Sequence, residues 1–385
     1  MKLKFDTSVP YALALEGGGA RGGYQIGAWR ALREAGVQIH AVSGTSVGAL
    51  NGALIAMGNL ERAEEIWREI RYSQVIDVDD ETMYGLLHGD LAGLNLRTAY
   101  TQLRDVLRNR GLDVAPLYEM MQRVVDEKAV RESDTELFIV TYSLSDRREL
   151  ELRARDLPEG TICDMLLASA YLPVFRSEPL GGKRYTDGGV RDVLPLHVLV
   201  EAGCRDIIAV RLNGFGVERR VRVPKHTNLY TVSPSQDLGG TLDFDPETSS
   251  RNLAMGYYDT QRLLYGLRGR RWYFDMDWTE GDAFAKLKGW IRRSLILRRQ
   301  QLPLREIHER VIPELAKELD VENGTYAEIY AAGLESLCEQ AALERWHIYT
   351  EPELTAALDA ALGAGAPLPA LDKVLTPKRR LPVRK

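Results

Sequence analysis

The chain has 385 residues, 45% of them hydrophobic, and carries a formal net charge of −5 at pH 7. A chain of this length can bury a large core, so we expect one large domain with an accessory region. The acidic balance excludes a general attraction for nucleic acid or anionic membranes, and any such attraction must be local. The sequence contains the three cysteines Cys163, Cys204 and Cys338 without C-x-x-C spacing. This pattern argues against a structural zinc site and indicates free thiols in a reducing compartment.

The amino-terminal region gives no signal for export or for a membrane span. Lys2 and Lys4 are followed by Asp6, and the apolar run before Glu16 is too short for the core of a signal peptide. Residues 35–60 carry no formal charge, but polar residues and five glycines interrupt them. This stretch is better explained as a strand, a tight turn and a buried helix. We therefore expect a cytoplasmic protein whose contact with membranes, where it occurs, is peripheral.

The predicted elements alternate between strand and helix. Strands are predicted at "YALALEG" and "IHAVSG", and helices over about 22–35 and at "VGALNGALIAMG" and "LERAEEIWREI". After a less regular, mostly helical stretch over about 72–133, strands return at "ELFIVTYSL" and "DIIAVRL". Such alternation is typical of a parallel sheet covered by helices on both faces. We predict an α/β domain over residues 9–265 with 72–133 as a cap-like insertion, followed by a mostly helical region with a basic tail over 266–385.

The first motif is "LALEGGGARGGYQIG", with six glycines in fifteen residues. Glycine opens positive φ and lets backbone N–H groups approach a ligand, which fits either a phosphate or the oxyanion of an attacked ester. Gly17, Gly19 and Gly22 match a dinucleotide-binding G-x-G-x-x-G. However, no acid lies between Glu34 and Glu61 to hold a ribose, and no G-K-[ST] follows. The sequence thus disfavours nucleotide binding.

Two further motifs supply a nucleophile and a base. "GTSVG" places Ser46 in a G-x-S-x-G elbow, where a strand turns sharply into a helix and exposes the hydroxyl, although a close-packed turn gives the same pattern. Asp187 lies in "RYTDGGV" at the end of a predicted strand. It is interpreted either as the catalytic base or as part of an ordinary Asp-Gly turn. None of the six histidines has the context of a triad base, and His197 in "LPLHVLVEAG" is interpreted as a packed or surface residue.

Taken together, "GGGARG", "GTSVG" and "DGG", each after a predicted strand, resemble the patatin-like phospholipase family, as does the A-S-x-x-x-P-x-F run before the last motif. The resemblance covers about residues 9–265 and implies a patatin-like three-layer α/β/α fold. It also implies a catalytic dyad of Ser46 and Asp187 without histidine. By the same resemblance, the oxyanion hole is formed by Gly17, Gly18 and Gly19, with Arg21 and Gly22 shaping the turn.

The activity implied is hydrolysis of fatty-acyl esters in phospholipids, lysophospholipids or glycerolipids. Transfer of the acyl group to another alcohol and a non-catalytic lipid-binding module are the alternatives. Because an Asp with its reference pKa is a feeble base, we expect a partly desolvated site around Asp187. Arg21 either supports the glycine loop or meets a lipid phosphate. No carboxylate cluster has calcium-site spacing, so we expect metal-independent chemistry without a cofactor.

The segment 286–299, "KLKGWIRRSLILRR", has six bases and no acid. On a helix, its apolar residues form one stripe flanked by cations, the pattern of an interfacial helix. The segment either packs this stripe on the catalytic domain or docks the protein on anionic membranes. The stripe consists of Leu287, Trp290, Ile291 and Leu295, and the basic tail that would assist docking contains Lys378, Arg379, Arg380, Arg384 and Lys385. We expect no nucleic-acid partner, and the sequence leaves the oligomeric state open.

Overall fold

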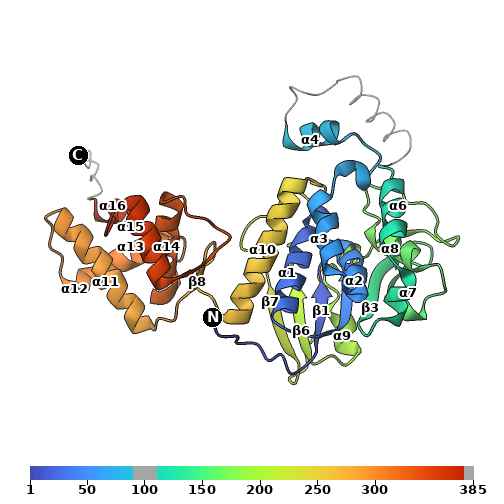
Figure 1. Ribbon diagram of the computed structural model, residues 1–385, viewed down its shortest axis with the longest axis horizontal. Helices are drawn as coiled ribbons and strands as arrows, with labels where there is room; N and C mark the ends of the chain where they lie inside the picture. Colours follow the sequence, from blue (N-terminus) through green and yellow to red (C-terminus); the bar gives the residue numbers. More distant parts are fainter. Residues whose placement is uncertain (90–110, 377–385) are drawn as a thin grey trace, which may run out of the picture. The chain divides into compact units, whose positions relative to one another are not determined.

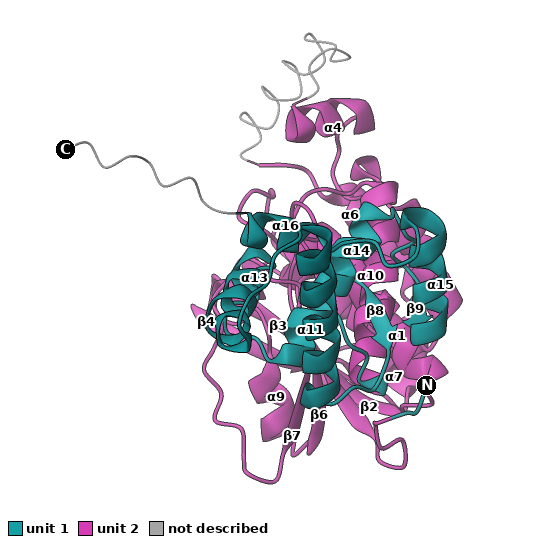
Figure 2. Ribbon diagram, turned by 90° about the vertical axis from the view of Figure 1, so that its left-hand side faces the viewer, with its two compact units in different colours: residues 1–3, 265–385 teal, residues 4–264 magenta. Residues whose placement is uncertain are grey.

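The computed structural model describes residues 1–89 and 111–376. The chain divides into two compact units (Figure 2). We call residues Lys4–Leu264 the α/β unit, and Tyr265–Lys385 together with Met1–Leu3 the helical unit. Each unit is described by itself.

A seven-stranded sheet forms the centre of the α/β unit, with β5 paired to β3 and the other strands in the order β4-β3-β2-β1-β6-β7 (Figure 1). Five strands are parallel, and β4 and β5 run antiparallel to β3. The prediction of a mainly parallel sheet is confirmed. The strands are β1 (Tyr11–Leu15), β2 (Ile39–Thr45), β3 (Glu136–Ser143), β4 (Arg148–Arg153), β5 (Tyr185–Asp187), β6 (Asp206–Val210) and β7 (Asn228–Val232).

Helices lie on both faces of this sheet, which confirms the three-layer fold. On β2, Val42 lies beneath Gly52 of α2 (Val47–Met57), whereas the preceding Ala41 packs in a cluster with residues of α9 (Leu196–Glu201). Successive strand residues point to opposite faces, so α2 and α9 cover different faces. The other helices of the unit are α1 (Gly23–Glu34), α3 (Leu60–Glu69), α4 (Asp80–His88), α6 (Ala115–Val124), α7 (Glu127–Glu132), α8 (Ile162–Ala170) and α10 (Pro246–Tyr265), with short 3-10 turns η1 (Gly19–Gly22), η2 (Tyr72–Gln74), η3 (Ala154–Asp156) and η4 (Gly188–Val190).

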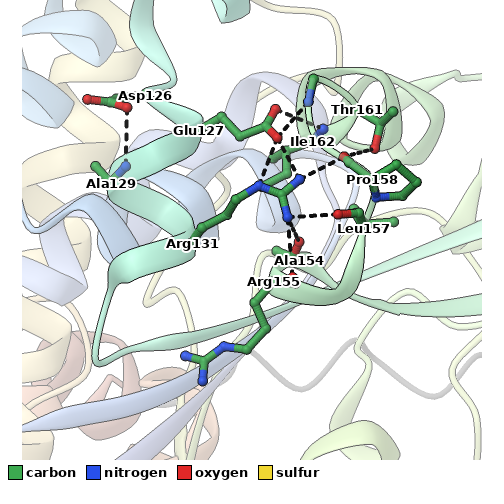
Figure 3. A network of polar contacts seen from close by, with 11 residues as sticks. Asp126, Glu127, Ala129, Arg131, Ala154, Arg155, Leu157, Pro158, Thr161 and Ile162 are labelled. Carbon is green, nitrogen blue, oxygen red and sulfur yellow. Dashed lines mark hydrogen bonds and ion pairs between the residues drawn. The ribbon is translucent and has the colours of Figure 1, made fainter.

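The described part of the predicted insertion is mostly helical, and residues 90–110 lie outside the described residues. Figure 3 shows how its last helix, α7, is fixed. Arg131 donates to the carbonyl oxygens of Leu157 and Pro158, both at 2.7 Å, and pairs with Glu127. Glu127 in turn accepts the Gly160 N–H at 2.8 Å. These bonds tie α7 to the chain that leads into α8, so this end of the insertion is part of the α/β unit's framework.

The helical unit has its own apolar core. Leu287, Ile291 and Leu295 of α11 (Glu280–Leu297) are buried in it, and Trp290 packs against it. The stripe predicted at 286–299 therefore packs, but within its own unit instead of on the catalytic domain. The remaining elements are α12 (Leu304–Glu306), the π-helical turn η5 (Ile307–Val311), α13 (Ile312–Glu318), α14 (Tyr326–Gln340), α15 (Glu351–Leu362), α16 (Pro369–Leu375) and the paired strands β8 (Tyr273–Asp275) and β9 (Ile348–Thr350).

The region after residue 265 is thus mostly helical, as predicted. The basic tail residues Lys378, Arg379, Arg380, Arg384 and Lys385 lie outside the described residues. Among the residues that are described, no helix combines the length and the apolar character needed to cross a bilayer.

Candidate active site

Ser46 stands between β2 and α2 in a strained conformation, with φ 56° and ψ −128°. A non-glycine residue at positive φ is uncommon and persists only where its surroundings hold it. The flanking glycines make the turn possible, because a Cβ on Gly44 would lie 2.2 Å from the Gly48 carbonyl carbon. A Cβ on Gly48 would lie 2.3 Å from the Leu15 carbonyl oxygen. The sequence-predicted elbow is therefore a real, tightly packed turn with Ser46 at the helix N-terminus.

Ser169, which the sequence analysis did not assign to the site, holds this elbow in place. Its hydroxyl accepts the Ser46 N–H at 2.8 Å and donates to the Val140 carbonyl at 2.6 Å. The elbow is thereby tied to the neighbouring strand β3. Sequence signals for this role were limited to the A-S-x-x-x-P-x-F run, which includes Ser169 but does not reveal its partners.

Asp187 ends β5 and is buried beside Ser46. Burial raises the pKa of Asp187 to about 6, while the Ser46 hydroxyl and the Gly189 N–H lower it. Oδ1 accepts the Gly189 N–H at 2.7 Å. Among the described residues, Oδ2 has no partner that meets ordinary hydrogen-bond geometry, although the Ser46 hydroxyl is near enough to lower the pKa of Asp187. Catalytic hydrogen bonds are often long before substrate binds. The desolvation that the sequence analysis required of this carboxyl is confirmed.

The glycine turn offers two backbone donors instead of the three implied by the sequence. Gly17 is already engaged, since its N–H donates to the Val193 carbonyl at 2.8 Å. Within the described parts of the chain, the N–H groups of Gly18 and Gly19 donate to no acceptor. Gly19 has φ 57°, and a Cβ there would lie 2.2 Å from the Thr241 carbonyl oxygen. The predicted oxyanion hole is corrected accordingly: Gly18 and Gly19 have free donors, and Gly17 shapes the turn.

Gly22 and Arg21 support this turn through contacts with α2 and with residues 213 and 239. A Cβ on Gly22 would lie 2.4 Å from Val47 Cγ2, so only glycine lets the turn pack on the start of α2. Arg21 donates through Nε to the Gly239 carbonyl at 2.8 Å and through Nη1 to the Asn213 carbonyl at 2.6 Å. Of the two interpretations of Arg21, the structure favours support of the loop over contact with a lipid phosphate.

Glu16, a buried residue that sequence reasoning missed, fixes the chain opposite the glycine turn. Its carboxylate accepts three successive N–H groups: Leu212 at 2.6 Å, Asn213 at 3.2 Å and Gly214 at 3.2 Å. Burial raises the pKa of Glu16, and these hydrogen bonds together with Arg211 oppose the rise. The available signal was an acid placed between a buried strand and a run of glycines, where a charge needs dedicated partners.

An apolar pocket opens beside Ser46. Among the described residues that line it, only Gly19, Ser46 and Asn51 are not apolar, and the side-chain oxygen of Asn51 already accepts the indole N–H of Trp67 at 2.9 Å. The pocket is formed mainly by α2, α3 and α6, so residues from the described end of the insertion line it. Its apolar lining consists of Val47, Leu50, Leu54, Ile66, Trp67, Ile70, Val75, Leu117, Met120, Met121, Val124, Val125, Ala170, Leu172, Phe175 and Phe244.

His197 belongs to a different polar cluster. Its Nδ1 lies 2.7 Å from Asp192 Oδ2 and its Nε2 lies 2.7 Å from Glu151 Oε1, and neither Ser46 nor Asp187 is among its partners in the described residues. Burial lowers the pKa of His197, but hydrogen bonds to the two acids outweigh it and the net shift is upward. In the described chain, Glu149, Glu151 and His197 are also the group whose ligand atoms, within 4.8 Å of one another, could hold a metal ion. Arg219 already lies 3.4 Å from Glu151, so this cluster is charge-paired without one.

The site combines a strained serine at a strand-to-helix turn with a buried carboxylate beside it. Among the described residues, two backbone N–H groups nearby have no acceptor. These features define an α/β protein with a nucleophile-elbow site. The family model described as patatin-like phospholipase matches residues 13–200, which include all of these residues. This match identifies residues 13–200 as a patatin-like phospholipase domain.

The chain spans about half or less of the length of the curated relatives that it matches. An uncharacterized NTE family protein of Mycobacterium tuberculosis is 26% identical over 215 residues, covering 56% of this chain and 52% of that protein. Patatin-like phospholipase domain-containing protein 6 of Homo sapiens is 29% identical over 209 residues, covering 53% of this chain and 13% of that protein. Among solved structures, VipD from Legionella pneumophila aligns with a TM-score of 0.39 and 14% identity over 96% of this chain and 92% of that one.

Proposed function

We propose that this protein hydrolyses fatty-acyl ester bonds of phospholipids, lysophospholipids or glycerolipids, with Ser46 as nucleophile and Asp187 as base. One observation carries the proposal: Ser46 lies between a buried carboxyl whose pKa is raised to about 6 and a pocket with an almost wholly apolar lining. A hydrocarbon chain fits such a lining, and a base with a pKa near 6 is ionised at neutral pH yet basic enough to take a hydroxyl proton.

The reaction follows from these positions. Asp187 takes the proton of Ser46 Oγ as that oxygen attacks the acyl carbonyl, and the carbonyl oxygen becomes an oxyanion held by the N–H groups of Gly18 and Gly19. The C–O bond to the alcohol then breaks, and Asp187 returns the proton to the leaving alkoxide. Water repeats the sequence on the acyl-serine and releases the fatty acid. The N-terminal dipole of α2 favours the negative charge in both halves.

The pocket supports an acyl chain as the part of the substrate that is recognised. Because Ser46 lines the same cavity as Leu50, Leu54 and Met121, a chain lying there places its ester carbonyl beside Ser46 Oγ. The alcohol part then remains outside the apolar lining. This arrangement is compatible with several head groups, and with an alcohol in place of water as the acyl acceptor.

The test combines covalent labelling with product analysis. Wild-type protein is expected to react with a serine-directed fluorophosphonate and to release free fatty acid from mixed lipid vesicles, as followed by mass spectrometry. Ser46→Ala is expected to lose both, while Ser43 and Ser169 remain in the variant as internal controls. Labelling and turnover of Ser46→Ala at the wild-type rate would refute the assignment. Transfer of the acyl chain to an added alcohol without free fatty acid would identify an acyltransferase instead.

A further inference from the structure

The connection between β6 and β7 presents an aromatic side chain to solvent. Phe215 is 98% exposed and Val217 is 54% exposed. A parallel pair of strands is usually joined by a helix, but residues 211–227 contain none. Exposed large apolar side chains that lie close together often mark an interaction surface. We call residues 211–225 the β6–β7 loop.

The part of this loop that carries Phe215 is held firmly. A Cβ on Gly214 would lie 1.9 Å from the Gly17 carbonyl oxygen, and one on Gly216 would lie 2.6 Å from the Gly189 carbonyl oxygen. Val217 N–H donates to that Gly189 carbonyl at 2.9 Å. Two glycines thus press the backbone against the glycine turn and the turn after Asp187, and Phe215 between them points away. Its exposure is built into the packing of the loop.

The rest of the loop is rich in cations. Residues 211–225 contain five bases and one acid. Arg211 pairs with Glu218, the loop's acid, and Arg219 pairs with Glu151 of β4. The three remaining bases, Arg220, Arg222 and Lys225, are exposed and form no ion pair within the described residues.

Two of these cations have partly buried neighbours in the sequence. Val221 and Val223 are partly buried against the apolar cluster under α9. Arg220 and Arg222 alternate with them in the sequence, and both side chains are exposed. A net-negative protein therefore carries an exposed phenyl ring next to the glycine turn, and exposed cations further along the same connection.

We propose that the β6–β7 loop docks this protein on anionic lipid bilayers, with Phe215 inserted at the interface and Arg220 and Arg222 on lipid phosphates. Aromatic side chains flanked by cations suit the boundary between headgroups and acyl chains, and each base near an anionic leaflet strengthens binding. The proposal rests on the proposed function, because docking there brings the glycine turn and Asp187 to the surface that contains the substrate.

The apolar stripe of α11, which the sequence suggested as a docking surface, is not exposed. Leu287, Ile291 and Leu295 are buried in the core of the helical unit. The helix retains exposed Ile296 and Leu297, at 75% and 65%, and the exposed bases Arg292 and Arg293. These residues match the β6–β7 loop in kind and so provide control variants.

The experiment uses Ser46→Ala protein, so that lipid is not consumed and a failure of the proposed function leaves the binding result readable. Co-sedimentation is measured with phosphatidylcholine vesicles with and without phosphatidylglycerol, at low and high salt. We expect binding that requires phosphatidylglycerol and weakens with salt. Phe215→Ala and the pair Arg220→Glu/Arg222→Glu are each expected to bind about tenfold or more weakly. Ile296→Ala and Arg292→Glu/Arg293→Glu are expected to bind like the parent.

Docking by this loop is refuted if the parent does not bind anionic vesicles, or if the Phe215 and arginine variants bind as the parent does. Loss of binding in the α11 variants alone would assign docking to α11. In active protein, Phe215→Ala is expected to keep hydrolysis of a soluble short-chain ester and to lose hydrolysis of vesicle lipid. Loss of both activities would make Phe215 part of the fold of the site and would overturn the proposal.

Discussion

The two units each bury a carboxylate that accepts three successive backbone N–H groups, and they use it differently. In the helical unit, Glu335 Oε1 accepts the N–H groups of residues 270–272, which lead into β8. In the α/β unit, Glu16 uses both oxygens to accept those of residues 212–214, which pack on the glycine turn. In both cases hydrogen bonds replace the water that burial removes.

Asp187 is buried too, but it has fewer hydrogen-bond donors than Glu16 or Glu335. Its carboxylate has one backbone donor, from Gly189, and an oxygen without a well-formed partner among the described residues. The helical unit satisfies its buried carboxylate and surrounds it with an apolar core. The α/β unit satisfies Glu16, which holds the site in place, and leaves Asp187 under-satisfied, where a proton has to move. Glu16 and Glu335 each accept three backbone N–H groups, whereas the candidate base Asp187 accepts one.

Removing the ionisable group of Asp187 gives the largest expected effect. Asp187→Asn keeps the shape of the side chain but removes the base, so kcat for a soluble ester is expected to fall by at least about 10²-fold. Steady-state kinetics on folded protein, checked by circular dichroism, measure this. His197→Ala is the control and is expected to lower kcat much less, since His197 contacts Asp192 and Glu151 instead of Ser46. If the histidine variant is the crippled one, a triad replaces the dyad.

The same group affects stability with pH. Burial raises the pKa of Asp187 from 3.8 to about 6, so between these pH values the folded protein holds more protons than the unfolded chain. Stability from this group is therefore full below about pH 4 and is lost as pH rises through 6, by about 3 kcal/mol in all. Activity changes in the opposite direction, because kcat/KM requires the ionised base. It is expected to be half-maximal at about pH 6 and to level off above about pH 7.

Asp187→Asn removes this linkage. At pH 8 the variant is expected to be more stable than the parent by about 3 kcal/mol, and at pH 4 the difference is expected to be small. Urea unfolding at the two pH values measures it. A variant less stable than the parent at pH 8 would show that the ionised carboxylate is well satisfied, contrary to the contrast drawn with Glu335.

Crowding the glycine turn tests the two free donors. In Gly18→Val the added Cβ lies 2.9 Å from Leu212 Cδ1 and 3.0 Å from Leu212 Cβ. Rotation of the Leu212 side chain leaves the second contact in place, so we expect the turn to shift and misdirect its N–H groups. We expect kcat to fall by about 10²-fold with Ser46 untouched. Gly289→Val in α11 is the matched control, because a Cβ there meets nothing within 4 Å. Calorimetry with NAD is expected to show no binding to the parent, and tight binding at this turn would restore the nucleotide interpretation.

Replacing each of the two buried glutamates with glutamine compares the two units directly and has the smallest expected effect. Glu16→Gln turns one accepting oxygen into a donor facing an N–H, and is expected to cost about 2 kcal/mol of stability and to lower kcat. Glu335→Gln can keep its single accepting oxygen in place and is expected to cost about 1 kcal/mol without changing kcat. Urea unfolding and ester kinetics measure both. Equal losses of stability with unchanged kcat in both variants would show that Glu16 does not position the site.

Local pattern was enough to predict the parts of this protein that depend on neighbouring residues. Alternating strand and helix periods predicted the parallel sheet and its three layers. The glycines around Ser46 predicted a sharp turn, because no other residue allows the backbone approach seen at Gly44 and Gly48. The sequence predicted that Asp187 lies at the end of a strand, but not that this strand runs antiparallel to β3 or that Asp187 lies beside Ser46.

Only the tertiary structure decided which backbone N–H groups and side chains already have hydrogen-bond partners. Nothing near Gly17 in sequence shows that the distant Val193 carbonyl takes its N–H, or that Glu16 and Arg21 find their partners in residues 212–214 and 239. The apolar period of α11 shows that one face is buried, but it does not show what covers that face. Hydrogen-bond partners and the second surface of a packed helix come from chain segments far apart in sequence, so their identity is set only when the chain has folded.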